Sequence, residues 1–318
     1  MFRIMSKRSV AVVCATTVSV IWGLSFLSTK VAVAVMPPMC IAVARFAVAV
    51  AVILPIALFK REDLRFSLRD LPFMAGSGLL GITFYFLCEN NGIALITASE
   101  SSLVIATIPV LTLLVDRAIL KTRLKARSYA GAVLSFAGVA LIVAPSLRRA
   151  SSPIEGFAYM GGAAACWVAY ALLTKPLSGK YGGLSITFWQ SLFGLAGCIP
   201  FALAEGGGWV GSLSLTVALN VLYLGLLCSA AGYLLYIAAI EELGAGASSV
   251  FLNLVPIVSV AAAFLILGER LGGLTLAGGA IAVGGVYLAT TPGRSSVAGG
   301  KRAGAAKGGV REGHRSSS

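Results

Sequence analysis

The residues that could do chemistry are few, and they stand apart from one another within apolar runs long enough to cross a membrane. The single histidine, His314, lies close to the C-terminus, and the six cysteines show no paired spacing. There is no HxxxH motif and no GxxxxGK[ST] phosphate-binding loop. Enzymes and metal sites need clustered groups of this kind. We therefore expect no catalysis, no metal, no cofactor and no ATP-driven pumping.

Aromatic residues form the first chemically suggestive group. Trp22 is followed by Phe26 and Trp167 by Tyr170, and each tryptophan precedes a lysine by eight residues. Tryptophan in membrane proteins is commonest at the interface, but these two lie about two turns inside their runs. We expect them to line a cavity for an apolar or aromatic solute, with plain packing as the alternative. Weaker candidates of the same kind are Tyr85, Tyr233 and Tyr236.

Two prolines, Pro109 and Pro256, lie near the middle of their apolar runs. Proline has no backbone N–H and frees the carbonyl four residues earlier, here at Ile105 and Leu252. In hydrocarbon, a freed carbonyl must face protein, water or solute. We interpret the prolines as hinges beside a cavity, with fixed packing kinks as the alternative. The polar residues beside them, predicted to face that cavity, are Thr107 and Asn253.

Basic residues mark the ends and the interior of several runs. Lys30 and Lys175 end the first and sixth runs, where they either snorkel to the headgroups or act as gates that attract an anionic group. Arg45 lies about two turns into the second run, where an unpaired charge is expensive. We expect Arg45 to snorkel outward or to pair with Glu89 or Glu100.

Acidic residues are confined to the ends of the runs. Glu89 precedes Asn90 and Asn91 and forms with them a polar cluster that we expect at the mouth of the cavity. Glu100 is expected in a solvent-exposed loop. No acid occupies the middle of any run, which argues against a proton relay through a buried carboxylate and leaves exchange or facilitated export open.

The composition identifies the class of protein. Of 318 residues, 58% are apolar and 12% are charged, and the mean hydropathy is +0.92. Soluble domains carry about 25% charged residues, so a polytopic membrane protein is expected. The formal charge of +13 resides in short loops and in the tail. We therefore attribute it to membrane topology and expect no nucleic-acid partner.

The chain is an internal duplication. Residues Ala98–Leu141 align with Ala245–Leu288 at an offset of 147 without a gap, with 13 identities in 44 positions that include both prolines. Upstream, at an offset of 145, Trp22 aligns with Trp167 and Thr29-Lys30 with Thr174-Lys175. Two matched prolines and two matched tryptophans do not follow from biased composition, so each half is expected to be one repeat.

Apolar runs of about 20 residues predict ten transmembrane helices. The expected helices are 9–34, 39–59, 71–91, 98–119, 128–144, 156–174, 184–203, 217–240, 245–267 and 274–290. Five helices per repeat is an odd number, so the repeats must be inverted about an axis in the membrane plane. The predicted regions are a basic leader (1–8), the two repeats (9–145 and 156–291) and a disordered tail (292–318).

The distribution of basic residues predicts the orientation. With the N-terminus inside, the inner segments carry 20 Lys and Arg residues and the outer segments carry 4. Under the positive-inside rule this places both termini in the cytoplasm and the chain in the cytoplasmic (inner) membrane as a multi-pass protein. A signal peptide at the N-terminus is the alternative for the first run, which is long for that role and has a copy in the second half.

Several of these features together resemble the EamA-type members of the drug/metabolite transporter superfamily. One departure is that Lys121-Thr122-Arg123-Leu124 stands where the family usually has Gly-Glu-Arg-Leu. The features that carry the resemblance are Trp22-Gly23 with Phe26 and Lys30, Arg45-Phe46, Glu89-Asn90 with Thr97-Ala98, Pro109, Pro256 and Gly268-Glu269-Arg270-Leu271.

This resemblance implies a central cavity lined by helices 1, 3, 4, 6, 8 and 9, with helices 5 and 10 at the periphery. It also implies export or exchange of small metabolites, including amino acids, nucleobase-like compounds and drugs. We therefore expect a secondary transporter that works by alternating access, with a passive channel or facilitator as the alternative. The expected partners are a small-molecule substrate and the lipid bilayer, and the expected state is a monomer or homodimer.

Overall fold

The computed structural model describes residues 7–120, 126–149, 153–243, 251–269 and 271–290. Within these residues the regular elements are helices, and one isolated β-bridge joins Ser178 to Tyr181. The predicted all-α architecture is confirmed. The tail predicted to be disordered lies outside the described residues.

The first half supplies five apolar segments. Its first two are single helices, α1 (Lys7–Val33) and α2 (Pro38–Phe59). The third runs through α3 (Leu71–Gly78), the π-helix η2 (Leu79–Phe84) and α4 (Tyr85–Leu95). The fourth consists of α5 (Ala98–Ile105) and α6 (Ile108–Leu120), and the fifth is α7 (Ala126–Arg149).

The second half follows the same order. The sixth and seventh segments are α8 (Ile154–Thr174) and α9 (Gly183–Glu205). The eighth runs through α10 (Leu215–Tyr223), the π-helix η4 (Leu224–Ala231) and α11 (Gly232–Leu243). The ninth includes α13 (Leu254–Ala262) and the π-helix η5 (Ala263–Leu267), and the tenth is α14 (Gly273–Thr290).

Six of these segments are long and apolar enough to cross a membrane by length and composition. Four shorter apolar helices, in the fourth, fifth, ninth and tenth segments, complete the predicted set of ten. The third and eighth segments both contain a π-helix at their centre, a distortion that is rare in helices and frequent at functional sites. The third and eighth segments, which occupy equivalent places in the two repeats, therefore share this irregularity.

Two segments depart from the continuous helices expected from sequence. The fourth is interrupted at Ala106-Thr107, and the ninth has a turn at Leu252-Asn253, in each case just before the proline. After the break in the ninth segment, the Val255 N–H donates to the Leu252 carbonyl at 3.0 Å. The carbonyl freed by Pro256 is thus satisfied by a tighter turn.

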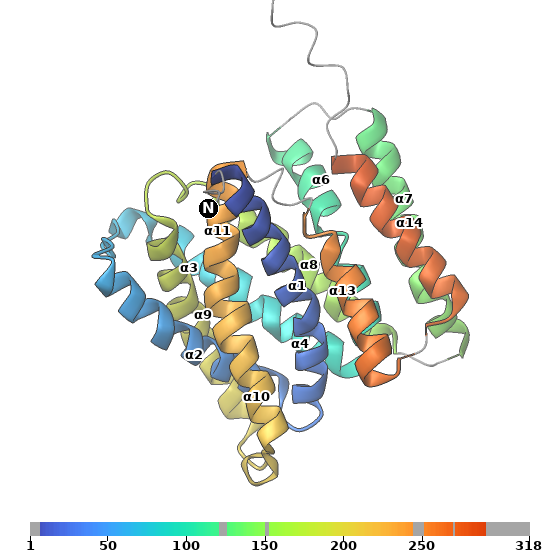
Figure 1. The fold of residues 1–318 in the computed structure, drawn as a ribbon, viewed down its shortest axis with the longest axis horizontal. Coiled ribbons are helices and arrows are strands. Elements are labelled where there is room, and N and C mark those ends of the chain that lie inside the picture. The colour runs from blue at the N-terminus through green and yellow to red at the C-terminus, as the bar shows by residue number, and fades with distance from the viewer. Residues whose placement is uncertain (1–6, 121–125, 150–152, 244–250, 270, 291–318) are drawn as a thin grey trace, which may run out of the picture.

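Helices α7 and α14 lie side by side at one edge of the bundle (Figure 1). A Cβ added at Gly138 would overlap the backbone of Gly278 and Ala282, and one added at Gly285 would overlap Gly131 and Ser135. At the 147-residue offset these contacts are equivalents of one another, as a two-fold axis between the helices requires. The fifth and tenth segments are therefore the peripheral, symmetry-related pair of an inverted repeat.

Candidate functional site

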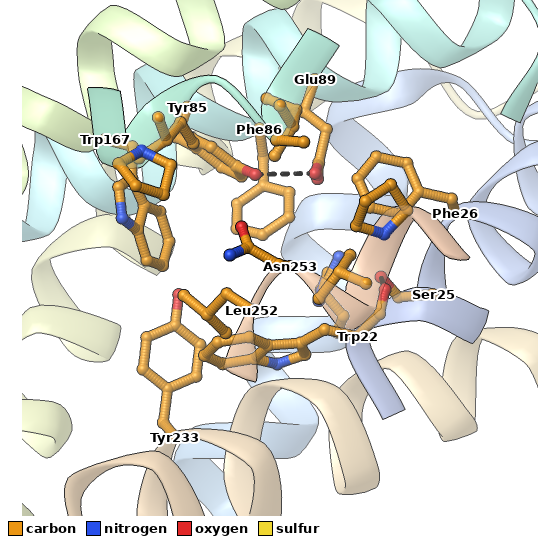
Figure 2. A pocket seen from close by; sticks show the side chains of 17 residues that line it. Trp22, Ser25, Phe26, Tyr85, Phe86, Glu89, Trp167, Tyr233, Leu252 and Asn253 are labelled. Atoms are coloured by element: carbon orange, nitrogen blue, oxygen red, sulfur yellow. Dashed lines mark hydrogen bonds between the residues drawn. The ribbon is translucent and has the colours of Figure 1, made fainter. Parts of the chain in front are cut away.

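A cavity of about 100 Å³ lies between the two repeats (Figure 2). Segments 1, 3, 4, 6, 8 and 9 all contribute to its wall, and segment 2 adds Arg45. The volume is smaller than the roughly 300–1,000 Å³ of pockets for drug-sized ligands, so in this conformation it accommodates only a small solute. The residues predicted from sequence that line it are Trp22, Phe26, Arg45, Tyr85, Glu89, Pro109, Trp167, Tyr233, Asn253 and Pro256.

Aromatic rings form most of one wall. Trp22 and Trp167 meet edge to face with ring centroids 6.3 Å apart, so the paired tryptophans of the two repeats are in contact. Tyr233 lies 5.8 Å from Trp22, and Tyr85 lies 5.3 Å from Trp167. The indole N–H of Trp22 donates to the Cys228 carbonyl at 3.1 Å, which fixes the ring. These rings offer a preorganised apolar surface to a solute.

Arg45 is buried at 4% exposure and lines the same cavity. Its Nε donates to the Ser229 hydroxyl at 2.9 Å, and its Cζ lies 4.3 Å from the centre of the Phe86 ring. A second, longer cation–π contact places Cζ 5.6 Å from the centre of the Phe46 ring, so the guanidinium is held by one hydrogen bond and two cation–π contacts. Arg45 was expected to snorkel outward or to pair with Glu89 or Glu100, but its side chain lines the cavity and forms no ion pair within the described residues.

Glu89 is buried at 6% exposure and accepts a hydrogen bond of 2.8 Å from the Tyr85 hydroxyl (Figure 2). It lines the cavity with Arg45, but no nitrogen of Arg45 lies within 4.0 Å of a Glu89 oxygen in the described part of the chain. Two opposite charges therefore face one cavity without closing on each other.

Asn253 and the two prolines bring the broken helices to the cavity. The Asn253 side chain lies between Phe86 and Trp22 in Figure 2, and its amide forms no hydrogen bond to another described residue. Pro109 and Pro256 line the wall, each shortly after the break in its own segment. The two helix breaks thus place the unpaired Asn253 amide and non-helical backbone beside Arg45 and Glu89.

Four residues predicted from sequence to face the cavity lie outside its wall. Asn90 is fully buried, and its amide donates to the Pro38 carbonyl at 2.8 Å. Thr107 donates to the Val104 carbonyl and lines a separate apolar cavity next to α7 and α8. Tyr170 contacts Trp167, and Tyr236 contacts Trp22, in each case with tilted rings whose centroids are 5.2 Å apart. The hydrogen bonds of Asn90 and Thr107 and the ring contacts of Tyr170 and Tyr236 account for these positions.

Lys30 lies beside the turn between α4 and α5. Its ammonium donates to the carbonyls of Ile93 and Ile96, both at 2.7 Å, and thus caps the C-terminal end of α4. Glu100 is buried at 7% exposure in a capping box with Thr97, so the expectation of a solvent-exposed loop residue was wrong. The local signal for this was present, because Thr-x-x-Glu is the capping-box pattern.

Glu269 joins the second repeat to the first at the same end. Its carboxylate accepts from the backbone N–H of Ala98 at 3.1 Å and from the Ser99 hydroxyl at 2.7 Å, and so caps the N-terminus of α5. Glu205 caps α2 in the same manner through the N–H groups of Met39 and Cys40, at 2.9 Å and 3.1 Å. Acids at helix N-termini are stabilising through both hydrogen bonds and the helix dipole.

The opposite end carries its own contact between the repeats. Asp70, at the start of α3, accepts from Lys180 at 2.8 Å and from the Tyr181 hydroxyl at 2.7 Å. The hydrogen bond that Lys180 donates to Asp70 raises the pKa of the Lys180 ammonium above its ordinary value, which favours the charged form of Lys180 at neutral pH. Lys175, which was predicted as a gate, is exposed and lies near this end.

Several residues of the wall and its support were not predicted from sequence, among them Phe86, Ser25 and Ser229. Phe86 and Ser25 line the cavity, and Ser229 orients Arg45. Phe86 and Ser25 each stand next to or one turn from a residue that was predicted. Nothing in the sequence indicated a role for Ser229, because a single serine in an apolar helix is common and its partner Arg45 lies 184 positions away.

Comparison with known proteins gives a match over both halves. The model of the EamA-like transporter family matches residues 9–144 and 155–291. A protein of Archaeoglobus fulgidus named "Uncharacterized transporter" is 29% identical over 277 residues, covering 87% of this chain and 97% of that protein.

Two further relatives carry more specific names. One from Streptantibioticus cattleyicolor, named "Probable terminal-alkyne amino-acid exporter", is 31% identical over 71% of this chain and 79% of its own length. One from Salmonella typhimurium, named "Probable amino-acid metabolite efflux pump", is 28% identical over 86% and 92%. A solved structure described as "Crystal structure of protein" shares the fold, with a TM-score of 0.64 at 20% identity over 89% of this chain and 98% of that one.

Proposed function

The chain belongs to the EamA-like transporter family, and from this premise we propose that it is a secondary transporter of small organic metabolites such as amino acids or related compounds. It acts as an exporter or exchanger across the cytoplasmic membrane. The names of two relatives as amino-acid exporters or efflux pumps support this solute class.

The observation that carries the proposal is the cavity between the repeats. It is apolar and aromatic over most of its wall, contains one guanidinium and one carboxylate, and is reached by two helices broken at matched prolines. Polar groups inside a membrane protein are costly unless they serve a solute or each other. Such a site binds a small solute midway across the bilayer, as carriers do.

Alternating access is supported by the contacts at the two ends. Glu269 and Glu205 hold the repeats together at the end where α4 meets α5, and Asp70 holds them at the other end. A carrier must release one set of contacts at a time as the repeats rock about the site. The helix breaks before Pro109 and Pro256 supply the flexible points for that motion.

The excess of basic residues in the inner segments supports the orientation that we propose. In this orientation the chain crosses the inner membrane with both termini in the cytoplasm. The Asp70 contact then lies on the cytoplasmic side and the Glu269 contact on the outer side. The carrier works as a monomer or a homodimer. The contact of α7 with α14 occurs within one chain, so the first repeat finds its counterpart without a second copy.

A passive channel or facilitator is the competing function. Channels show charged rings or rows of carbonyls along an open path, whereas this cavity is small and bounded by aromatic rings. Uptake of a panel of radiolabelled amino acids and related metabolites into proteoliposomes containing the full chain separates the two. A carrier saturates with solute concentration, and a channel gives flux that rises linearly.

A further inference from the structure

The cavity contains one buried cation and one buried anion that do not pair with each other. Arg45 and Glu89 both line its wall, yet their charged atoms lie further apart than the 4.0 Å of an ion pair. Buried charges are expensive unless compensated by close partners. An arrangement that keeps two compensating charges close but separate leaves room for something to bind between them.

One hydrogen bond orients each charged side chain, and its remaining donor or acceptor atoms stay available to a solute. Arg45 uses Nε for Ser229, and within the described part of the chain its two terminal nitrogens have no hydrogen-bonded partner. Glu89 uses one oxygen for the Tyr85 hydroxyl, and its other oxygen has no donor among the described residues. A planar guanidinium fork matches a carboxylate, and a carboxylate oxygen accepts from an ammonium group.

The two charges come from one repeat alone. At the 145-residue offset Arg45 corresponds to Gln190, and at the 147-residue offset Glu89 corresponds to Tyr236. Gln190 donates to the hydroxyls of Ser77 and Thr174, both at 2.9 Å, so its amide nitrogen is already satisfied. The cavity therefore has a charged side made by the first repeat, although its tryptophans come from both.

The rest of the wall suits an apolar group. Figure 2 shows Tyr233 across the cavity from Glu89, with Trp22 and Trp167 at the sides. A solute with both charges held at Arg45 and Glu89 would direct its remaining atoms toward these rings. The free amide of Asn253, between the two sides, can bond to either end of such a solute.

We propose that Arg45 and Glu89 form a two-point receptor for a zwitterion, in which Arg45 binds the carboxylate and Glu89 the ammonium group of a small apolar amino acid. This inference rests on the proposed transport function and adds the recognising residues and the charge of the solute. A solute carrying only one of the two charges leaves one buried group of the receptor unpaired, which is the source of the selectivity.

The test is binding of three matched solutes to the purified full-length chain, measured by thermal shift over a concentration series. L-Valine carries both charges, 2-methylpropylamine lacks the carboxylate, and 3-methylbutanoate lacks the ammonium group. The wild type should bind L-valine roughly tenfold or more tightly than either analogue, as expected for a charged hydrogen bond.

Two neutralising variants should change this ranking in opposite ways. Arg45→Gln, which introduces the residue of the second repeat, should abolish the preference for L-valine over 2-methylpropylamine and keep the preference over 3-methylbutanoate. Glu89→Gln should do the reverse. Arg65→Gln and Glu155→Gln, at exposed positions, are the matched controls and should behave as wild type.

Loss of one buried charge can prevent folding, so the double variant Arg45→Gln/Glu89→Gln, which keeps the site neutral, is measured as well. It should fold and discriminate among none of the three solutes. Wild-type selectivity in a folded double variant, equal binding of all three solutes by the wild type, or binding of none of them would overturn the receptor. Flux of other metabolites in that last case would leave the transport proposal standing, whereas absence of any carrier-like flux refutes transport itself.

Discussion

Trp22 and Trp167 occupy equivalent positions in the two repeats and touch each other, ring edge against ring face, with centroids 6.3 Å apart. Residues 145 positions apart in sequence meet here because an inverted repeat folds its equivalent helices around one axis. The cavity wall is thus built where the two repeats meet. Its aromatic part is shared by both repeats, whereas its charges belong to one.

The tryptophan pair predicts that solute binding can be weakened by a substitution that has only a small effect on stability. Trp22→Ala removes a ring that contacts three other aromatic residues and should cost about 3–5 kcal/mol of stability. Trp22→Phe and Trp167→Phe keep most of the packing and should weaken solute binding by severalfold with a smaller loss of stability. Thermal unfolding with and without solute measures both effects. Solute-induced shifts that match those of the wild type in both phenylalanine variants would remove the tryptophans from the binding surface.

The contact between α7 and α14 predicts a sharp effect of one methyl group. Gly138→Ala places a Cβ against the backbone of α14 and should destabilise the chain by about 1–3 kcal/mol. Gly161→Ala, in α8, meets nothing within 4 Å and should be neutral or stabilising, because alanine favours helix over glycine by about 1 kcal/mol. Thermal unfolding in detergent compares them. Equal unfolding temperatures would argue against the close approach of the two helices.

The broken helices predict that replacing either hinge proline raises the stability of the chain and slows transport. Pro256→Ala restores a backbone donor in the ninth segment, so the unfolding free energy should rise by up to about 3 kcal/mol, while solute exchange slows. Pro109→Ala should act similarly in the fourth segment. Pro55→Ala is the control, because Pro55 also lies inside a helix but is exposed and distant from the cavity wall. Undiminished exchange in both hinge variants would show that the breaks are packing kinks.

The capping contacts predict opposite shifts of the access equilibrium. Glu269→Gln weakens a helix cap worth about 0.5–2 kcal/mol, so opening at the α4–α5 end should increase about twofold to thirtyfold. Asp70→Asn should favour opening at the other end, by less, because its partner Lys180 is largely exposed.

The readout is a cysteine placed at Ser25, in the cavity wall, within a chain lacking its six native cysteines. A membrane-impermeant thiol reagent is added to one side of proteoliposomes at a time. Each variant should raise the labelling rate from its own side. Equal changes from both sides would contradict the assignment of the two contacts to opposite ends.

Much of the architecture could be predicted from sequence because hydrocarbon imposes simple rules. Apolar length predicts spanning segments, and the matched prolines and tryptophans reveal the repeat. The breaks before Pro109 and Pro256 follow from the missing N–H. The positions of the helix ends differ by a few residues, since capping partners such as Glu269 come from distant segments.

The kinds of residue that form the site could be predicted from sequence, but the positions of several of them could not. Ten predicted residues line the cavity, because a tryptophan or an arginine deep in an apolar helix has few alternatives to facing inward. Asn90 and Thr107 could not be placed, because each finds its hydrogen-bond acceptor on the backbone and so turns away from the cavity. Which side of a helix faces a neighbour depends on packing, and one sequence does not contain that information.

Counterflow in proteoliposomes tests the central claim most directly. Vesicles containing the full-length chain are loaded with unlabelled L-valine and diluted into trace labelled L-valine, with empty vesicles as control. A carrier predicts transient accumulation of label above the outside concentration, saturation with external solute, and loss of the effect without internal solute. Linear, unsaturated entry of label, unaffected by what the vesicles contain, would contradict a carrier and support a channel.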